Sequence, residues 1–372
     1  MSHRQLRTAI TGLLMGVALA CSSPVDSVPN PADEPRLAEY GPTLIWNAIA
    51  RQLIKDRGVP RVTDEVRVLA YLSIAQNNAL VSAPASLLSP TLFVAEASAA
   101  ILREFFPHDI AALDAAIRDQ EVNAARRGAT AETVAAAKIM GRTIAVQVMA
   151  SAKGDLTQIL ANRNPDYGLY GARTFVIPDS IGHWQQAPPE YLSKGHLGAL
   201  AEVSILAHER SDAQVQLARD WSTRAASYLN GLVAAAIVRN QRTERDAVRI
   251  LALANMAGFD AYLGCAALKV TFQYPQPSMV DRSIVTIGLP TQPSFPSDPS
   301  CLVAAFATIM DLLVPADAGA LKNAVRDAGL AALYAGQHYR FDIEAGEDVG
   351  RTVASTVVST LGTAPGAFVL KQ

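Results

Sequence analysis

The chain has 372 residues, half of them hydrophobic, which is enough to build a large core in one or two domains. Its formal net charge is −2 and it has no long basic run, so the composition argues against a nucleic-acid partner. Aromatic residues make up only 6% of the chain, and the predominance of alanine and branched aliphatic residues favours packed helices over sheets.

The first twenty residues have the pattern of an export signal. Arg4 and Arg7 precede a short apolar run at 10–19, and the stretch "ALAC" then ends at Cys21. This arrangement resembles the lipobox of bacterial lipoproteins, which implies removal of residues 1–20, diacylation of Cys21 and contact with a membrane through that anchor. The alternative is an ordinary cleaved signal with an incidental cysteine.

A proline-rich stretch, "SSPVDSVPNPADEP", follows Cys21, and residues 21–35 are expected to form an extended tether. Ser22, in place of aspartate, resembles the sorting signal for the outer membrane of Gram-negative bacteria. The protein is therefore expected in the bacterial cell envelope, lipid-anchored and facing the periplasm from the outer membrane. No later segment is expected to cross a bilayer, because the apolar stretch 301–314 is shorter than the roughly 20 residues that a spanning helix needs.

Residues 36–372 are expected to form one helical domain. Helical spacing of apolar residues begins in "LIWNAIARQLI" (44–54) and continues through segments with N-terminal capping signals. Those signals are Thr63, Ser89 followed by Pro90, and a capping box from Ser211 to Gln214.

Further helices are predicted in the second half of the chain. A long apolar helix at 247–272 ends just before Pro275, a proline-rich loop follows, and a buried helix is predicted at 301–314. The last helices lie within 323–361, and no strand alternation is visible. The fold class is therefore predicted as all-α, a multi-helix bundle.

Two cysteines remain after Cys21. Export permits a disulfide between Cys265 and Cys301, but both could equally be small buried apolar residues. The sequence leaves these two interpretations open.

One short stretch, "GQHYRFDIEAG" (336–346), carries the clearest chemical pattern. His338 and Asp342 are four residues apart, so on a helix the carboxylate can reach the imidazole. An acid behind a histidine orients one ring nitrogen as a nucleophile or base. The simpler alternative is an exposed ion pair.

Together with "KVTFQYPQP" (269–277) and "PSFPSDPS" (293–300), this stretch resembles the three-part signature of the type 2 phosphatidic acid phosphatase and vanadium-dependent haloperoxidase superfamily. That signature reads Lys, six residues, Arg-Pro; then Pro-Ser-x-x-Ser-Gly-His; then Ser-Arg, five residues, His, three residues, Asp. The phrases "IGHWQQAPP" (181–189) and "QLARDW" also resemble the soluble branch of the superfamily. The resemblance implies its helical bundle fold.

The resemblance assigns a role to four residues that match the signature. Lys269 and Ser297 would bind phosphate, His338 would be the catalytic nucleophile and Asp342 would orient it. A phosphate or vanadate group requires a cluster of positive charges and backbone donors, which the signature supplies. A simpler interpretation places Ser297 or Asp298 at a helix N-cap with Pro299 in the first turn.

Other positions depart from the signature. Gln276 stands where the signature has its first arginine. Asp298 stands in place of the glycine, and Pro299 stands in place of the histidine that donates a proton. The Ser-Arg pair is replaced by Ala331 and Ala332. Residues that folding could bring in as replacements are Arg282, Arg340, His183 and His208.

Two functions are therefore compared. The first is a phosphoric ester hydrolase of the acid-phosphatase type, with a phosphate ester as partner; haloperoxidase chemistry is less favoured, and vanadate enters as a cofactor by resemblance only. The alternative is a non-catalytic scaffold or binding lipoprotein of the cell envelope. No metal-ligand spacing is visible, although Asp298, His338 and Asp342 together could attract a cationic group. The sequence does not indicate the oligomeric state.

Overall fold

Helices form all the regular structure that the computed structural model describes, and no strand occurs among its described residues. These residues are 41–57, 62–84, 90–161, 174–176, 187–223, 226–288, 292–363 and 366–370. The predicted signal, Cys21, the tether and His183 lie outside them. The all-α prediction is confirmed.

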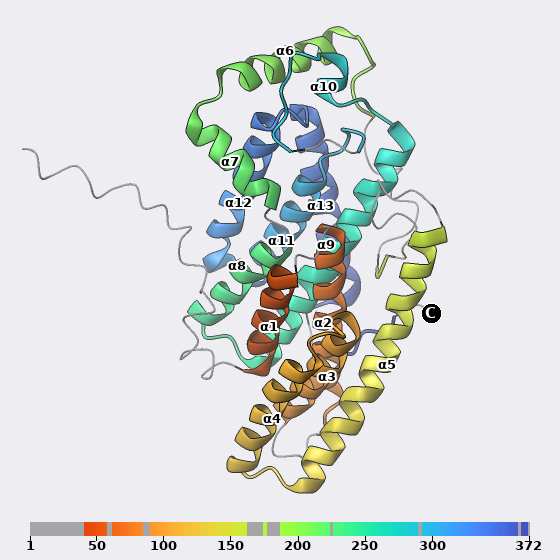
Figure 1. Cartoon of the computed structure of the whole chain (residues 1–372), viewed down its shortest axis with the longest axis vertical. Helices are drawn as coiled ribbons and strands as arrows, with labels where there is room; N and C mark the ends of the chain where they lie inside the picture. Colours follow the sequence, from red (N-terminus) through yellow and green to blue (C-terminus); the bar gives the residue numbers. More distant parts are fainter. Residues whose placement is uncertain are drawn as a thin grey trace, which may run out of the picture.

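Four helices form the centre of the bundle. They are α2 (Val62–Ser82), α9 (Glu244–Phe272), α11 (Asp298–Leu313) and α13 (Arg340–Leu361), and α9 packs against the other three (Figure 1). The segment Glu244–Val280 is long and apolar enough to cross a bilayer, contrary to the sequence-based expectation, but 94% of its apolar window is buried inside the bundle. It is the core helix of the domain.

The remaining helices surround this centre and extend it at both ends (Figure 1). One end carries α3 (Pro90–Phe105), α4 (Ile110–Arg126) and α5 (Ala131–Ala161), while α6 (Lys194–Glu209) and α10 (Pro277–Val280) lie at the other. The others are α1 (Pro42–Arg57), α7 (Asp212–Thr223), α8 (Ala226–Arg239) and α12 (Gly319–Tyr334).

Several predicted helix ends are confirmed. Pro90 is the first residue of α3, and α9 ends at Phe272. At α7 the Ser211 backbone N–H donates to Gln214 Oε1 at 2.7 Å, as the capping box predicts. The prediction for Thr63 is wrong, because α2 already begins at Val62.

Helix α13 lies unusually close to α11 because two glycines face it. A Cβ atom on Gly346 would lie 2.5 Å from the Ser297 carbonyl oxygen, and one on Gly350 would lie 2.5 Å from that of Cys301. Such contacts are too short for any side chain, so glycine is required here. The close approach brings the start of α13 against the start of α11.

A disulfide links α9 to α11 on the other side. Cys265 and Cys301 are fully buried and bonded, with their Cα atoms 6.7 Å apart, which settles the alternative that the sequence left open. Cys265 lies one helical turn before Lys269, and Cys301 lies one turn after Ser297. The bond therefore holds together the two helices that carry the first two signature segments.

Far from these segments, Glu96 of α3 is buried where α5 crosses it. A Cβ atom on Gly141 of α5 would lie 2.7 Å from the Glu96 Cβ, so the helices touch and the carboxyl group has little access to water. It lines a cleft of about 500 Å³ that Glu121 and Lys138 also line. Burial, followed by the hydrogen bond to Glu121, raises the pKa of Glu96 to about 7.

This shift predicts a pH-dependent stability. The folded state holds a proton on Glu96 that the unfolded chain releases above its ordinary pKa of 4.5, so the free energy of unfolding should fall as the pH rises from 4.5 to about 7. The loss should reach at most about 3 kcal/mol. Urea unfolding of the wild type and Glu96→Gln at pH 5 and pH 8 measures it. Equal changes in both proteins would contradict the assignment to Glu96.

Candidate functional site

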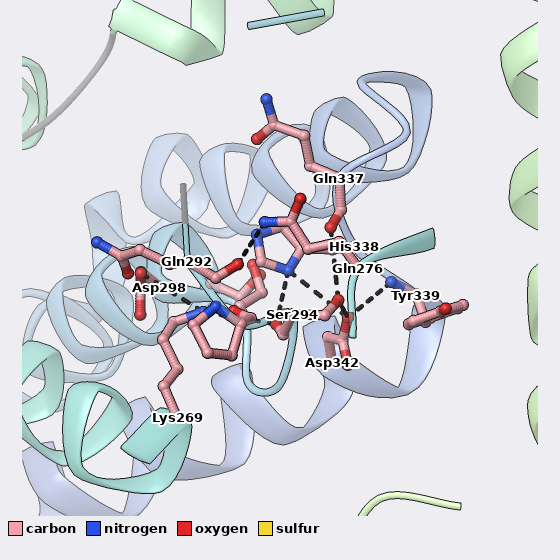
Figure 2. Close-up of polar contacts among 12 residues, drawn as sticks. Lys269, Gln276, Gln292, Ser294, Asp298, Gln337, His338, Tyr339 and Asp342 are labelled. Atoms are coloured by element: carbon pink, nitrogen blue, oxygen red, sulfur yellow. Dashed lines mark hydrogen bonds and ion pairs between the residues drawn. The ribbon is translucent and has the colours of Figure 1, made fainter. Parts of the chain in front are cut away.

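The three signature segments meet at the end of the bundle where α9 ends and α11 and α13 begin (Figure 2). Lys269 Nζ donates to the Pro293 carbonyl at 2.6 Å, and the Ser297 backbone N–H donates to the Asp342 carbonyl at 2.9 Å. The structure therefore brings the four predicted site residues together. We call the place bounded by Lys269, Asp298 and His338 the cradle.

Ser294 connects the three segments, although sequence reasoning gave it no role. Its carbonyl accepts from His338 Nδ1 at 2.8 Å and from Lys269 Nζ at 3.5 Å. Its backbone N–H donates to the Tyr274 carbonyl at 2.8 Å, and its hydroxyl donates to Asp342 Oδ2. The signature itself contains this serine, directly after Pro293, and that was the available signal.

The imidazole of His338 is held by a backbone carbonyl. Because the Ser294 oxygen can only accept, Nδ1 carries the proton and Nε2 of the neutral ring keeps its lone pair. Asp342 Oδ2 lies 3.6 Å from Nδ1, too far for a direct hydrogen bond. His338 also precedes α13 by two residues, so the expected helical i, i+4 pair is instead a contact between a turn and a helix.

The Asp342 carboxylate caps α13. Its Oδ2 accepts from the Tyr339 backbone N–H at 2.8 Å and from the Ser294 hydroxyl, and the residue is fully buried. A carboxylate in the first turn also interacts favourably with the helix dipole. Asp342 therefore fixes the turn that carries His338. Its role in orienting the imidazole stays a prediction, and the contacts that could carry it run through Ser294.

Lys269 is a buried cation with its partners inside the protein. Only 1% of the residue is exposed, and its ammonium group contacts the Pro293 and Ser294 carbonyls. Asp298 Oδ2 lies 3.6 Å from Nζ, close enough for an ion pair. The charge that would attract an oxyanion is thus balanced by a carboxylate of the same chain.

Asp298 is the first residue of α11, at the signature's glycine position. Burial raises the pKa of Asp298, and the positive charge of Lys269 opposes that rise, as would His338 in its protonated form. Its Oδ1 is buried and accepts no hydrogen bond from any described residue. On α9, burial together with the negative charge of Asp298 raises the pKa of Tyr262.

Ser297 and Pro299 lie where the helix-start interpretation places them, although the Ser297 side chain makes no capping hydrogen bond. Ser297 is the N-cap residue of α11 and Pro299 lies in the first turn. The Ser297 hydroxyl is fully buried and accepts from the Ser300 hydroxyl at 3.0 Å. Whether it also binds phosphate stays a prediction.

The positions of the two signature arginines carry no positive charge. The amide of Gln276 donates from Nε2 to the Gln292 carbonyl, and its buried Oε1 lacks a hydrogen-bond partner within the described part of the chain. Ala332 is buried in a small apolar cluster. Two buried, uncharged side chains therefore stand where the signature has arginines.

The proposed replacements do not restore the charge. Arg340 pairs with Glu202 at 2.9 Å, Arg282 is exposed, and His208 is exposed with Nδ1 2.7 Å from the Ser204 carbonyl. None of these three makes a hydrogen bond or an ion pair with Lys269, Asp298 or His338.

Helix α6 covers this end of the bundle through His196. The Leu192 backbone N–H donates to His196 Nδ1 at 3.0 Å, so Nε2 carries the proton and donates to the Tyr339 hydroxyl at 3.2 Å. Burial lowers the pKa of His196, which favours this neutral form. His338, the residue before Tyr339, is only 7% exposed.

Structural comparison identifies the fold. A bacterial vanadium-dependent iodoperoxidase superimposes with a TM-score of 0.68 at 18% sequence identity, over 88% of this chain and 98% of the peroxidase chain. The apo form of a bacterial vanadium-dependent chloroperoxidase gives 0.61 at 10% identity, over 80% of this chain and 92% of that chain. The holo form of a bacterial vanadium-dependent chloroperoxidase gives a TM-score of 0.61 at 11% identity, over 90% of this chain and 96% of that chain.

No protein-family model and no curated protein sequence matches the chain. The structural comparison therefore establishes the fold, which is the helical fold that the resemblance implied.

The residues present do not fit vanadate, the cofactor named for those structures. An oxyanion needs several cationic or backbone donors, whereas the cradle offers one lysine that Asp298 already neutralises. Within the described residues, no cluster of three or more histidine, cysteine, aspartate or glutamate side chains could hold a metal ion.

The Lys269–Asp298 pair predicts a large effect of removing the lysine. Lys269→Met would leave a buried carboxylate without its counter-ion, so the free energy of unfolding at neutral pH should drop by about 3–5 kcal/mol. The double variant Lys269→Met/Asp298→Asn should recover most of that loss. Urea denaturation measures both.

A matched control is a lysine of α12 that also pairs with an aspartate of α11. Lys322 pairs with Asp311 of α11 at 2.6 Å, but both side chains are at least half exposed. Lys322→Met should cost less than about 1 kcal/mol. If the two lysine variants lose the same stability, the buried ion pair does not have the importance assigned to it.

Proposed function

We propose that this chain is a non-catalytic lipoprotein of the bacterial cell envelope that retains the haloperoxidase-like bundle as a scaffold. The protein would perform neither phosphoric ester hydrolysis nor vanadium-dependent oxidation. The four residues that match the signature would remain without a catalytic role: Lys269, Ser297, His338 and Asp342. This is the alternative function that the sequence pattern left open.

The observation that carries the proposal is the position of Asp298. Its carboxylate lies at the N-terminus of α11 and 3.6 Å from the Lys269 ammonium. A helix N-terminus and a lysine are the two features that attract an oxyanion. At neutral pH, a phosphate group would have to displace this carboxylate or lie beside it, and like charges at such distance repel strongly.

The missing donors support the same conclusion. Pro299 cannot transfer a proton to a leaving group, and Gln276 and Ala332 cannot supply guanidinium groups. The loss of a single donor from an anion-stabilising site typically costs roughly 3 kcal/mol of transition-state stabilisation. Losses at three positions leave little of the rate enhancement that such sites provide.

A second candidate is a weak phosphoric ester hydrolase, and one observation favours it. The hydrogen bond from His338 Nδ1 to the Ser294 carbonyl leaves the Nε2 lone pair available for attack on phosphorus. A phosphate ester would then be the partner, with Lys269 and Ser297 holding its oxygens.

Turnover assays decide between the two functions. Wild type and His338→Ala should both match the buffer blank, within about twofold, in hydrolysis of a chromogenic phosphate ester at pH 5 and pH 7.5. Halide oxidation with added vanadate and peroxide should also stay at the blank. Hydrolysis by the wild type that His338→Ala abolishes would establish the hydrolase instead.

Membrane attachment is tested separately. If Cys21 carries the lipid, palmitate labelling of cells should mark the wild-type protein, which should fractionate with membranes. Cys21→Ser should lose the label and leave the membrane fraction. Equal labelling of the two proteins would contradict lipidation at Cys21.

A further inference from the structure

The cleft that Glu96 lines lies between α3, α4 and α5, the helices that form one end of the bundle (Figure 1). Its volume of about 500 Å³ is within the range of roughly 300–1,000 Å³ that is usual for small-molecule sites. All but one of the side chains that line it are charged, and basic groups outnumber acidic ones by one. Such a cleft suits a charged ligand rather than an apolar one.

The charged side chains reach the cleft because they recur at helical spacing. Asp114, Arg118 and Glu121 follow one another along one face of α4, and Lys138 and Arg142 are one turn apart on α5. Each helix therefore turns a charged stripe towards the same space.

Two ion pairs cross this space and account for four of the charges. Arg103 of α3 pairs with Asp114 of α4 at 2.6 Å, and Lys138 of α5 pairs with Glu121 of α4 at 2.8 Å. These contacts hold the three helices around the cleft. They leave three lining groups without an opposite charge.

Two of the three are arginines. Arg118 and Arg142 are exposed, and neither makes a hydrogen bond or an ion pair with any residue in the described part of the chain. A guanidinium group binds a carboxylate through two parallel N–H donors. The pair is therefore suited to the carboxylates of a ligand.

The third group is Glu96, which is only 5% exposed. In its protonated form it donates to Glu121, whose charge Lys138 already balances. Its other oxygen, Oε1, accepts no hydrogen bond from the residues that the structure describes. A buried carboxylate with an unpaired oxygen is unfavourable, so an ionised Glu96 requires a cationic donor.

The charged groups that act on Glu96 come from all three helices. Burial, followed by the hydrogen bond and the negative charge of Glu121, raises the pKa of Glu96 to about 7, against the positive charges of Lys138 and Arg103. Both protonation states are therefore populated at neutral pH. The proton on Glu96 can be exchanged for another cation at little cost in free energy.

We propose that this cleft binds a small acidic amino acid, with the ammonium group at Glu96 and the two carboxylates at Arg118 and Arg142. The unpaired charges of the cleft are one negative and two positive, and an acidic amino acid carries the complementary set. On binding, the proton of Glu96 leaves for the solvent and the ammonium group takes its place. This inference goes beyond the proposed function, because the site shares no residue with the cradle.

Calorimetric titration of the complete chain with L-glutamate tests the inference. The wild type should bind about tenfold more tightly at pH 8 than at pH 6, because binding requires an ionised Glu96. At pH 6, titrations in two buffers with different ionisation enthalpies should show release of about one proton per glutamate. Glutarate, which lacks the ammonium group, should bind at least about tenfold more weakly than glutamate at pH 8.

Variants assign the two halves of the site. Glu96→Gln should bind glutamate at pH 8 as weakly as the wild type does at pH 6, and without proton release. Arg118→Gln and Arg142→Gln should each weaken binding at pH 8 by about tenfold. Arg126→Gln is the matched control, because Arg126 is an exposed arginine of α4 that does not line the cleft. It should bind as the wild type does.

Several outcomes would overturn the inference. They are an absence of glutamate binding by the wild type, equal affinities for glutarate and glutamate, and wild-type affinity in Glu96→Gln. Equal binding by Arg118→Gln and Arg126→Gln would do the same. None of these results concerns turnover at His338, so the non-catalytic assignment is decided by the turnover assays alone. The thermal midpoint of each variant confirms that it is folded under the titration conditions.

Discussion

The buried ammonium group of Lys269 determines how the signature segments are arranged. A charge that is only 1% exposed requires compensation, because transfer from water to the protein interior costs several kcal/mol. The loop before α11 supplies two carbonyls, and Asp298 supplies the opposite charge. The hydrogen bonds and the ion pair of Lys269 thus hold the end of α9 against the start of α11.

This arrangement makes ligand binding compete with internal pairing. In a site built for an oxyanion, the ligand completes the charge balance and the empty site holds an excess of positive charge. Here the balance is complete without a ligand, since the carboxylate of Asp298 takes the anion's place. The same contact that stabilises the protein therefore opposes binding of an external anion at Lys269.

The sequence predicted the parts of the site that depend on spacing and local geometry. The resemblance of the three segments to the superfamily signature implied that Lys269, Ser297 and His338 would meet, and the proline in "SDPS" indicated a helix start there. The partner of the His338 ring did not follow. The pair with Asp342 fitted a helical spacing, but α13 begins only at Arg340, and the nearby carbonyl of Ser294 accepts the bond.

Features that depend on tertiary placement could not be predicted. Asp298 was identified as a departure from the signature, but its ion pair with Lys269 becomes visible only when α9 and α11 are placed side by side. The Cys265–Cys301 bond joins helices whose register the hydrophobic pattern does not fix. Sequence alone gives the chemical types present at the site, whereas their pairing follows from the packing.

The fold and the chemistry of this protein rest on different residues. The bundle superimposes on a vanadium-dependent iodoperoxidase at 18% identity, because helix packing tolerates many apolar substitutions. Gly346, Gly350 and the disulfide hold α11 against its neighbours through contacts that involve no charge. The positions of the cradle residues therefore persist when their charges change. The fold therefore fixes where Lys269, Asp298 and His338 lie, and the side chains at those few positions decide what the site can bind.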